Sequence, residues 1–133
     1  MADILMCPPD FFGIEYEINP WMDRTRDADH ETAVQQWQQL RTTLSDAGAT
    51  IHEMQPVAGL PDLVFTANAA LVYQRQALVS QFRPLQRQAE QMHDAEWFTG
   101  HGYQVRELDQ GLFFEGAGDA LFCGETLWAG YRM

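Results

Sequence analysis

The sequence predicts an α/β fold built from two copies of one unit, with helices outside a mixed sheet. The first observation is a repeat of two short segments, GATIHEM at 48–54 with GYQVREL at 102–108, and ALV at 70–72 with ALF at 120–122. The second is a polar turn between the members of each pair, at 61–68 and at 114–119. A period of about fifty residues is typical of repeated supersecondary units. Two such units do not close a ring, so we expect the chain to belong to a larger protein.

Local signals predict the elements of the first unit. Residues 4–6 form a short buried strand that ends before Pro8, and 12–18 are irregular. Asp29 is expected to cap a helix over 31–47, which Gly48 terminates. The apolar residues that share one face of this helix are Ala33, Val34, Trp37, Leu40, Leu44 and Ala47. A strand then follows at 50–54.

A hairpin and a second helix come next. Strands at 69–73 and 77–81 pair across 74–76, and Pro84 suits the first turn of a helix over 85–99. The residues expected on the inner face of that helix are Leu85, Ala89, Met92 and Trp97. The pattern then repeats with strands at 102–108, 120–122 and 126–131. No linker divides the chain, so residues 1–133 are expected to form part of a single domain.

Composition excludes several classes of function. The net charge of −11 argues against nucleic acid and anionic membranes as partners. No stretch approaches the about 18 apolar residues of a membrane span, and Asp3 stands where a signal peptide would be basic. The two cysteines, Cys7 and Cys123, have no metal-binding spacing. We therefore expect a cytoplasmic protein without metal or cofactor.

The polar residues of the two turns are the strongest site candidates, because loops on a rigid scaffold carry function. Matching places in two repeats would bring together Asp62, Asn68, Glu115 and Asp119. Carboxylates suit a guanidinium group, which presents five donors in a fixed fork. The alternative is that these residues only shape turns. A phosphate loop at 115–119 is disfavoured, because such a loop opens a helix and a strand follows here.

Arg83, Arg87 and Glu90 surround the start of the second helix. The two arginines could bind a substrate carboxylate, or Arg87 and Glu90 could form an i, i+3 pair on a solvated helix surface. Cys7 is expected to be a small buried apolar residue rather than a nucleophile. Cys123 lacks an evident base.

Together these segments resemble the opening of amidinotransferase-like penteins. The residues that carry the resemblance are 6–12 (MCPPDFF), Tyr16, 18–22 (INPWM), 61–69, 82–84 (FRP) with Arg87 and Glu90, and 114–119. They span essentially the whole chain and are most similar to the arginine dihydrolase and dimethylarginine dimethylaminohydrolase branch. The resemblance implies a five-bladed α/β propeller of ββαβ-type blades, of which this chain would supply about two.

The resemblance also implies a chemistry. A cysteine thiolate attacks the guanidinium carbon, an amine leaves, a histidine transfers protons, and water releases the product. By motif position, Glu115 matches the acidic residue beside that histidine. Asn68 matches a position that is aspartate in arginine deiminases, and Asn19 an asparagine that lines the pocket. The cysteine and histidine are expected beyond Met133, so the chain alone should be inactive.

The resulting hypothesis is the N-terminal portion of a guanidino-group hydrolase that acts on arginine or a methylated arginine. An amidinotransferase is the alternative among enzymes, and a non-catalytic pentein binding module the alternative from another class. The expected partner is a small guanidino substrate, with no nucleic acid or membrane. Exposed strand edges make a homo-oligomer possible.

Overall fold

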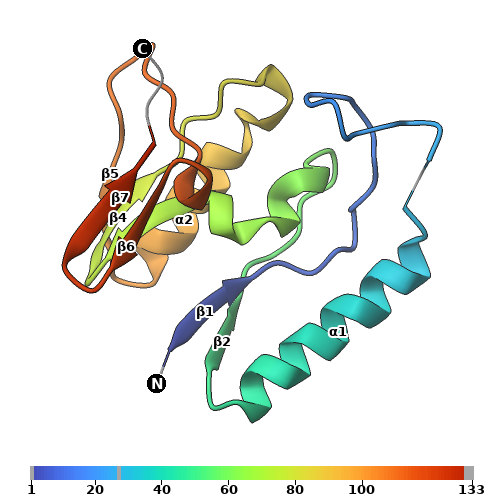
Figure 1. The fold of residues 1–133 in the computed structure, drawn as a ribbon, viewed down its shortest axis with the longest axis horizontal. Coiled ribbons are helices and arrows are strands. Elements are labelled where there is room, and N and C mark those ends of the chain that lie inside the picture. The colour runs from blue at the N-terminus through green and yellow to red at the C-terminus, as the bar shows by residue number, and fades with distance from the viewer. Residues whose placement is uncertain (1, 27, 131–133) are drawn as a thin grey trace. The chain divides into compact units, whose positions relative to one another are not determined.

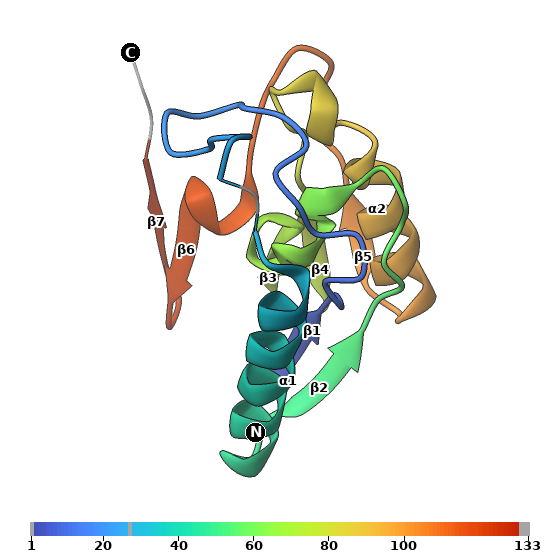
Figure 2. The ribbon, with the colours of Figure 1, turned by 90° about the vertical axis from the view of Figure 1, so that its right-hand side faces the viewer.

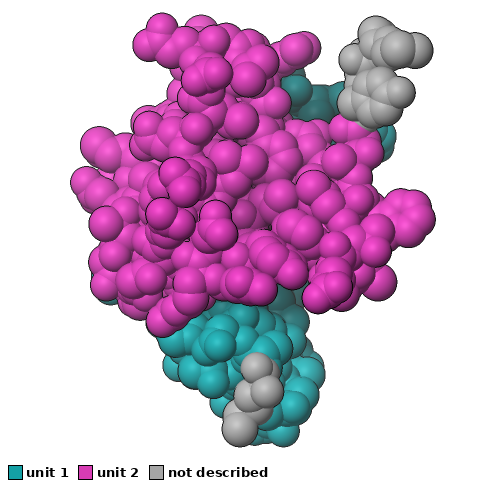
Figure 3. All heavy atoms as spheres, turned by 90° about the vertical axis from the view of Figure 1, so that its left-hand side faces the viewer, with its two compact units in different colours: residues 1–66 teal, residues 67–133 magenta. Residues whose placement is uncertain are grey.

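The computed structural model describes residues 2–26 and 28–130. The chain divides into two compact units, residues 1–66 and 67–133, which Figure 3 colours teal and magenta. Each unit is described by itself below. Figure 1 follows the order of helices and strands along the chain.

Unit 1 is built on a parallel pair of strands and one helix. Strand β1 (Asp3–Met6) pairs with β2 (Thr50–Glu53), and α1 (His30–Asp46) connects them and lies along β2 (Figure 2). The predicted cap is confirmed, because the Asp29 carboxylate accepts a hydrogen bond from the Thr32 N–H at 2.8 Å. The helix ends before Gly48, which has φ of 92°.

The apolar face predicted for α1 is only half covered. Ala33, Val34, Trp37 and Leu44 are half-buried, whereas Leu40 is 51% exposed. Ala47, the last residue of the predicted helix, follows α1 and is exposed.

Unit 2 contains a three-stranded mixed sheet and a separate hairpin. Strands β3 (Ala70–Tyr73) and β4 (Gln76–Val79) are antiparallel, and β5 (Gln104–Arg106) is parallel to β4. Strands β6 (Ala120–Cys123) and β7 (Thr126–Ala129) form the second hairpin. The strand predicted over 126–131 is confirmed as far as Ala129, and Tyr131 lies outside the described residues.

The predicted repeat of elements is confirmed. A parallel strand–helix–strand unit occurs twice, as β1–α1–β2 and as β4–α2–β5, where α2 is Glu90–Gly100. The two hairpins turn alike, with a left-handed residue at Gln74 (φ 55°) and at Gly124 (φ 60°). The sheets are open, and no closed barrel occurs within residues 2–26 and 28–130. The α/β class is therefore confirmed.

The second helix begins later than predicted. Pro84 precedes a short 3-10 turn (Leu85–Arg87), and α2 starts only at Glu90. The predicted inner face is wrong, because Leu85 is 79% and Met92 58% exposed. Ala89 is also exposed and Trp97 only half-buried. The side chains that α2 buries are Glu90, Asp94 and Phe98, so two carboxylates and one aromatic ring replace the predicted apolar stripe.

A buried ion pair explains why charged residues can face inward. Arg87 Nε and Nη2 donate to the two carboxylate oxygens of Glu90 at 2.9 and 2.8 Å. The guanidinium also lies 4.1 Å from the ring centroid of Phe82. The predicted i, i+3 pair is confirmed, but its predicted location on a solvated surface is wrong, since Arg87 is 7% and Glu90 2% exposed.

Candidate functional site

The junction between two short turns organises the candidate site in unit 2. Asn68 ends a 3-10 turn (Thr66–Asn68) before β3, and Glu115 precedes another (Gly116–Gly118) before β6. The Asn68 side-chain Nδ2 donates to the backbone carbonyl oxygen of Glu115 at 2.9 Å. The structure thus brings together two candidates that are 47 positions apart in the sequence.

Gly116 allows this close approach. A Cβ atom at Gly116 would lie 2.7 Å from the backbone oxygen of Ala67 and 2.9 Å from backbone carbons of Asn68. The residue also has φ of 59°, which disfavours any side chain. The sequence indicated a turn at 115–119, with a phosphate loop disfavoured, but it did not indicate this close approach to Ala67 and Asn68.

Asp119 closes the second turn. One of its carboxylate oxygens, Oδ2, accepts a hydrogen bond from the Glu115 N–H at 2.7 Å. The Asp119 N–H donates to the Gly116 carbonyl at 3.0 Å, and the Gly118 N–H to that of Glu115 at 3.1 Å. The backbone N–H and the backbone carbonyl oxygen of Glu115 are therefore both held by hydrogen bonds.

A cavity of about 560 Å³ opens beside this turn. Its lining includes three predicted site residues, Arg83, Glu115 and Asp119, with Phe113 and Phe114 among its apolar walls. The Arg83 guanidinium lies 5.3 Å from the ring centroid of Phe113. One cation and two carboxylates in one cavity can hold a small ligand that carries both signs of charge.

The remaining candidates lie elsewhere. Asn19 is exposed, and its Oδ1 accepts from the N–H groups of Trp21 and Met22 at 3.0 and 3.2 Å. Asp62 is 4% exposed within a 3-10 turn (Pro61–Val64) of unit 1. Arg87 is held by Glu90 as described above. A cleft shared by Asn19, Asn68 and Glu115 stays a prediction.

Neither cysteine lies in the cavity. Cys7 is 1% exposed and its Sγ lies 3.6 Å from the Pro8 carbonyl oxygen, as expected of a buried packing residue. Cys123 is exposed at the end of β6. Across residues 2–26 and 28–130, no three His, Cys, Asp or Glu side chains gather as a group that could hold a metal. In the same residues, no helix combines the length and apolarity needed to cross a membrane.

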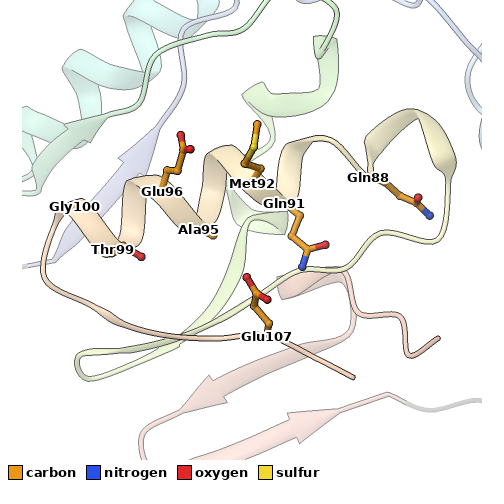
Figure 4. A pocket seen from close by; sticks show the side chains of 8 residues that line it. All are labelled: Gln88, Gln91, Met92, Ala95, Glu96, Thr99, Gly100 and Glu107. Carbon is orange, nitrogen blue, oxygen red and sulfur yellow. The ribbon is translucent and has the colours of Figure 1, made fainter. Parts of the chain in front are cut away.

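A second hollow, about 640 Å³, runs along α2 and contains none of the predicted site residues. Figure 4 shows its lining, in which Glu107 comes from the segment after β5 and the other side chains from α2 or just before it. Its residues are Gln88, Gln91, Met92, Ala95, Glu96, Thr99, Gly100 and Glu107.

Known proteins match the chain over nearly its whole length. The bifunctional arginine dihydrolase/ornithine cyclodeaminase ArgZ of Synechocystis sp. is 47% identical over 137 residues, which cover 98% of this chain and 19% of ArgZ. N(G),N(G)-dimethylarginine dimethylaminohydrolase of Mycobacterium tuberculosis is 40% identical over 95% of this chain and 41% of its own length. This chain is a homologue of these guanidino-group hydrolases of the pentein superfamily.

A solved structure agrees with this homology. A mutant of AgrE, the relative from Nostoc sp., in complex with L-arginine superimposes with a TM-score of 0.91 at 46% identity, over 97% of this chain and 19% of AgrE. No protein-family model matches the sequence. The chain spans about a fifth of the length of ArgZ and of AgrE, and it matches their N-terminal portion.

Proposed function

We propose that this chain is the N-terminal part of a single catalytic domain of a guanidino-group hydrolase. The substrate class is arginine or a methylated arginine. The reaction passes through an amidino group linked to a cysteine, and that cysteine and the proton-transferring histidine lie outside this chain. The proposal is supported by the homology to ArgZ and by the bound L-arginine in the AgrE complex.

The observation that carries the proposal is the charge arrangement of the cavity in unit 2. Arg83 supplies a cation and Glu115 a carboxylate, while the Asp119 carboxylate is bound to the Glu115 N–H. Free arginine has the complementary charges, an α-carboxylate at one end and a guanidinium at the other. In this proposal the Arg83 guanidinium binds the α-carboxylate of the substrate, and a carboxylate of the protein binds the substrate guanidinium. Both kinds of contact are strong and directional.

The individual roles follow from the resemblance and the geometry together. Glu115 stabilises positive charge on the neighbouring histidine, and Asn68 holds the turn that carries Glu115. The resemblance makes Asn19 and Asp62 further candidates for substrate binding. Arg87 is a second candidate for the substrate carboxylate, with its guanidinium oriented by Glu90.

The proposal also extends to the architecture. The repeated strand–helix–strand units and hairpins correspond to about two blades of a five-bladed propeller, and the remaining blades complete the pocket. The net charge of −11 favours a small cationic substrate, and a content of only two cysteines suits the reducing cytoplasm.

A chimeric protein, called the joined protein below, tests this proposal. In it, this chain replaces the matching N-terminal segment of AgrE, and AgrE supplies the rest of the sequence. We expect the joined protein to release ammonia from L-arginine. The same joined protein with Glu115→Gln should be strongly impaired, while Glu125→Gln, in the exposed β6–β7 turn, serves as a charge-matched control.

Circular dichroism and arginine binding show whether the joined protein is folded. A folded joined protein that binds arginine and releases no ammonia would contradict the proposed function. Equal activity of the Glu115→Gln and Glu125→Gln variants would contradict the proposed role of Glu115.

A further inference from the structure

The peptide groups on both sides of Glu115 are held by the side chains of other residues. Its N–H donates to Asp119 Oδ2 at 2.7 Å, and its carbonyl oxygen accepts from Asn68 Nδ2 at 2.9 Å. Glu115 itself has φ of −126° and ψ of 44°, outside the regular helix and strand regions. Its backbone geometry therefore depends on these two contacts and on the Gly118 N–H, which donates to the same carbonyl at 3.1 Å, rather than on a helix or strand ladder.

Asp119 is well placed to impose this geometry. Its N–H is bound to the Gly116 carbonyl at 3.0 Å, and its carbonyl oxygen accepts from the Gly130 N–H at 2.9 Å. The residue is thus anchored on both sides, and its short side chain reaches the Glu115 N–H directly. An oxygen acceptor at this position, carboxylate or amide, satisfies a peptide N–H that would otherwise lack this partner.

The neighbouring residue completes the frame. The Phe114 N–H donates to the Gln81 carbonyl at 3.0 Å, and the Gln81 N–H donates to the Phe114 carbonyl at 2.9 Å. Glu115 therefore lies between Phe114, which is paired with Gln81 just after β4, and a turn closed by Asp119. Little freedom remains for the direction in which its side chain leaves the backbone.

We propose that Asp119 is a positioning residue, which acts on the substrate through Glu115 rather than by direct contact with the guanidinium. The inference rests on the proposed function. It predicts that the acceptor atom of Asp119 matters more than its charge. Misplacement of a reacting group by about 1 Å can cost a hundredfold in rate, so loss of the contact should affect turnover before binding.

Two substitutions of Asp119 in the joined protein distinguish a positioning role from direct contact with the substrate. Asp119→Asn keeps an oxygen that can accept from the Glu115 N–H but removes the charge. Asp119→Ala removes both. A positioning role predicts kcat within about threefold of the parent for Asp119→Asn and a loss of about a hundredfold for Asp119→Ala, with KM changed less than kcat in each. Glu125→Gln is again the charge-matched control.

A second measurement uses the joined protein and needs no catalysis. Amide hydrogen exchange read by mass spectrometry with residue-level fragmentation reports on the Glu115 N–H. We expect exchange at Glu115 to be slow in the parent and in Asp119→Asn, and at least about tenfold faster in Asp119→Ala. The Tyr73 and Val79 amides of the first hairpin show whether the variant remains folded.

The outcomes are distinct. A rise in KM for Asp119→Asn that exceeds the fall in kcat means direct contact with the substrate and overturns the inference. Unchanged exchange at Glu115 in folded Asp119→Ala also overturns it. Asp119→Asn decides the kinetic question even if Asp119→Ala does not fold. An inactive parent joined protein would count against the proposed function, while the exchange data would still test the contact.

Discussion

The side-chain amide of Asn68 is hydrogen-bonded to the backbone carbonyl of Glu115, with 2.9 Å between Nδ2 and the oxygen. This contact joins the turn before β3 to the turn before β6, so equivalent turns of the two repeats meet. A hydrogen bond of this kind contributes about 1 kcal/mol to stability. Its greater consequence is geometric, because it fixes the residue that the proposed chemistry needs most.

Gly116→Ala should destabilise unit 2. The new Cβ would lie 2.7 Å from the Ala67 carbonyl oxygen, on top of the strain of a φ near 59°. Gly124→Ala is the matched control, because Gly124 has φ of 60° and open space around it. We expect Gly124→Ala to cost about 1 kcal/mol and Gly116→Ala at least about 2 kcal/mol more. Urea unfolding of both variants measures the difference, and equal losses would show that the close contact is relieved without cost.

Asp94 should make stability depend on pH. Its pKa is raised from 3.8 to about 8, first by burial and then by the charge of Glu90, while the charge of Arg87 acts in the opposite direction. The folded state therefore keeps a proton that the unfolded state has lost, and stability falls as pH rises from about 4 to about 8. Within the described residues, neither carboxylate oxygen has a hydrogen-bond partner, so no hydrogen bond stabilises the ionised form.

Asp94→Asn should remove this dependence, because the amide stays neutral. We expect the variant to gain on the order of 3 kcal/mol over the parent between about pH 5 and about pH 8. Urea unfolding across that range measures the gain, with Glu96→Gln on the exposed face of α2 as control. Parallel pH profiles of parent and Asp94→Asn would contradict the assignment.

Glu115→Gln in the joined protein should lower kcat more than it raises KM. A carboxylate beside a histidine stabilises positive charge that grows in the transition state, so its loss is felt mainly in turnover. We expect a fall in kcat of roughly a hundredfold. Steady-state kinetics on L-arginine test this, and an unchanged kcat would remove Glu115 from the mechanism.

The 133-residue chain by itself should release no ammonia from arginine. Groups that hold a guanidinium without attacking its carbon bind ground state and transition state about equally, which leaves the barrier unchanged. Assay of the purified chain measures this directly. Activity that is lost on alkylation of Cys7 or Cys123 would show that the nucleophile lies within the chain.

The same chain should self-associate. The β6–β7 hairpin exposes Leu121 by 57%, Leu127 by 47% and Trp128 by 68%, which is a large apolar surface for so short an element. Mass in solution measures the state of assembly. A stable monomer at high concentration would contradict the prediction of self-association through the exposed apolar hairpin. It would not bear on the proposed hydrolysis.

Local signals in the sequence were enough to predict the order of helices and strands. Short local signals predict three of these features, because each depends on only a few neighbouring residues. They are the Asp29 cap, the end of the helix at Gly48 and the hairpin before Pro84. The repeat was also visible, because both units use the same short strands and turns. The homology to guanidino-group hydrolases was likewise accessible from motifs, since their residues stand in order along the chain.

Only the tertiary structure decided which side chains α2 buries and how the turns meet. Apolar spacing favoured Leu85 and Met92, but Arg87 and Glu90 are buried instead, and their two mutual hydrogen bonds offset part of the cost of burying the charges. Gly116 could not be assigned from its neighbours, because the atoms it must avoid belong to Ala67 and Asn68. Contacts between distant segments depend on how whole elements pack, and that information is not present in any local pattern of residues.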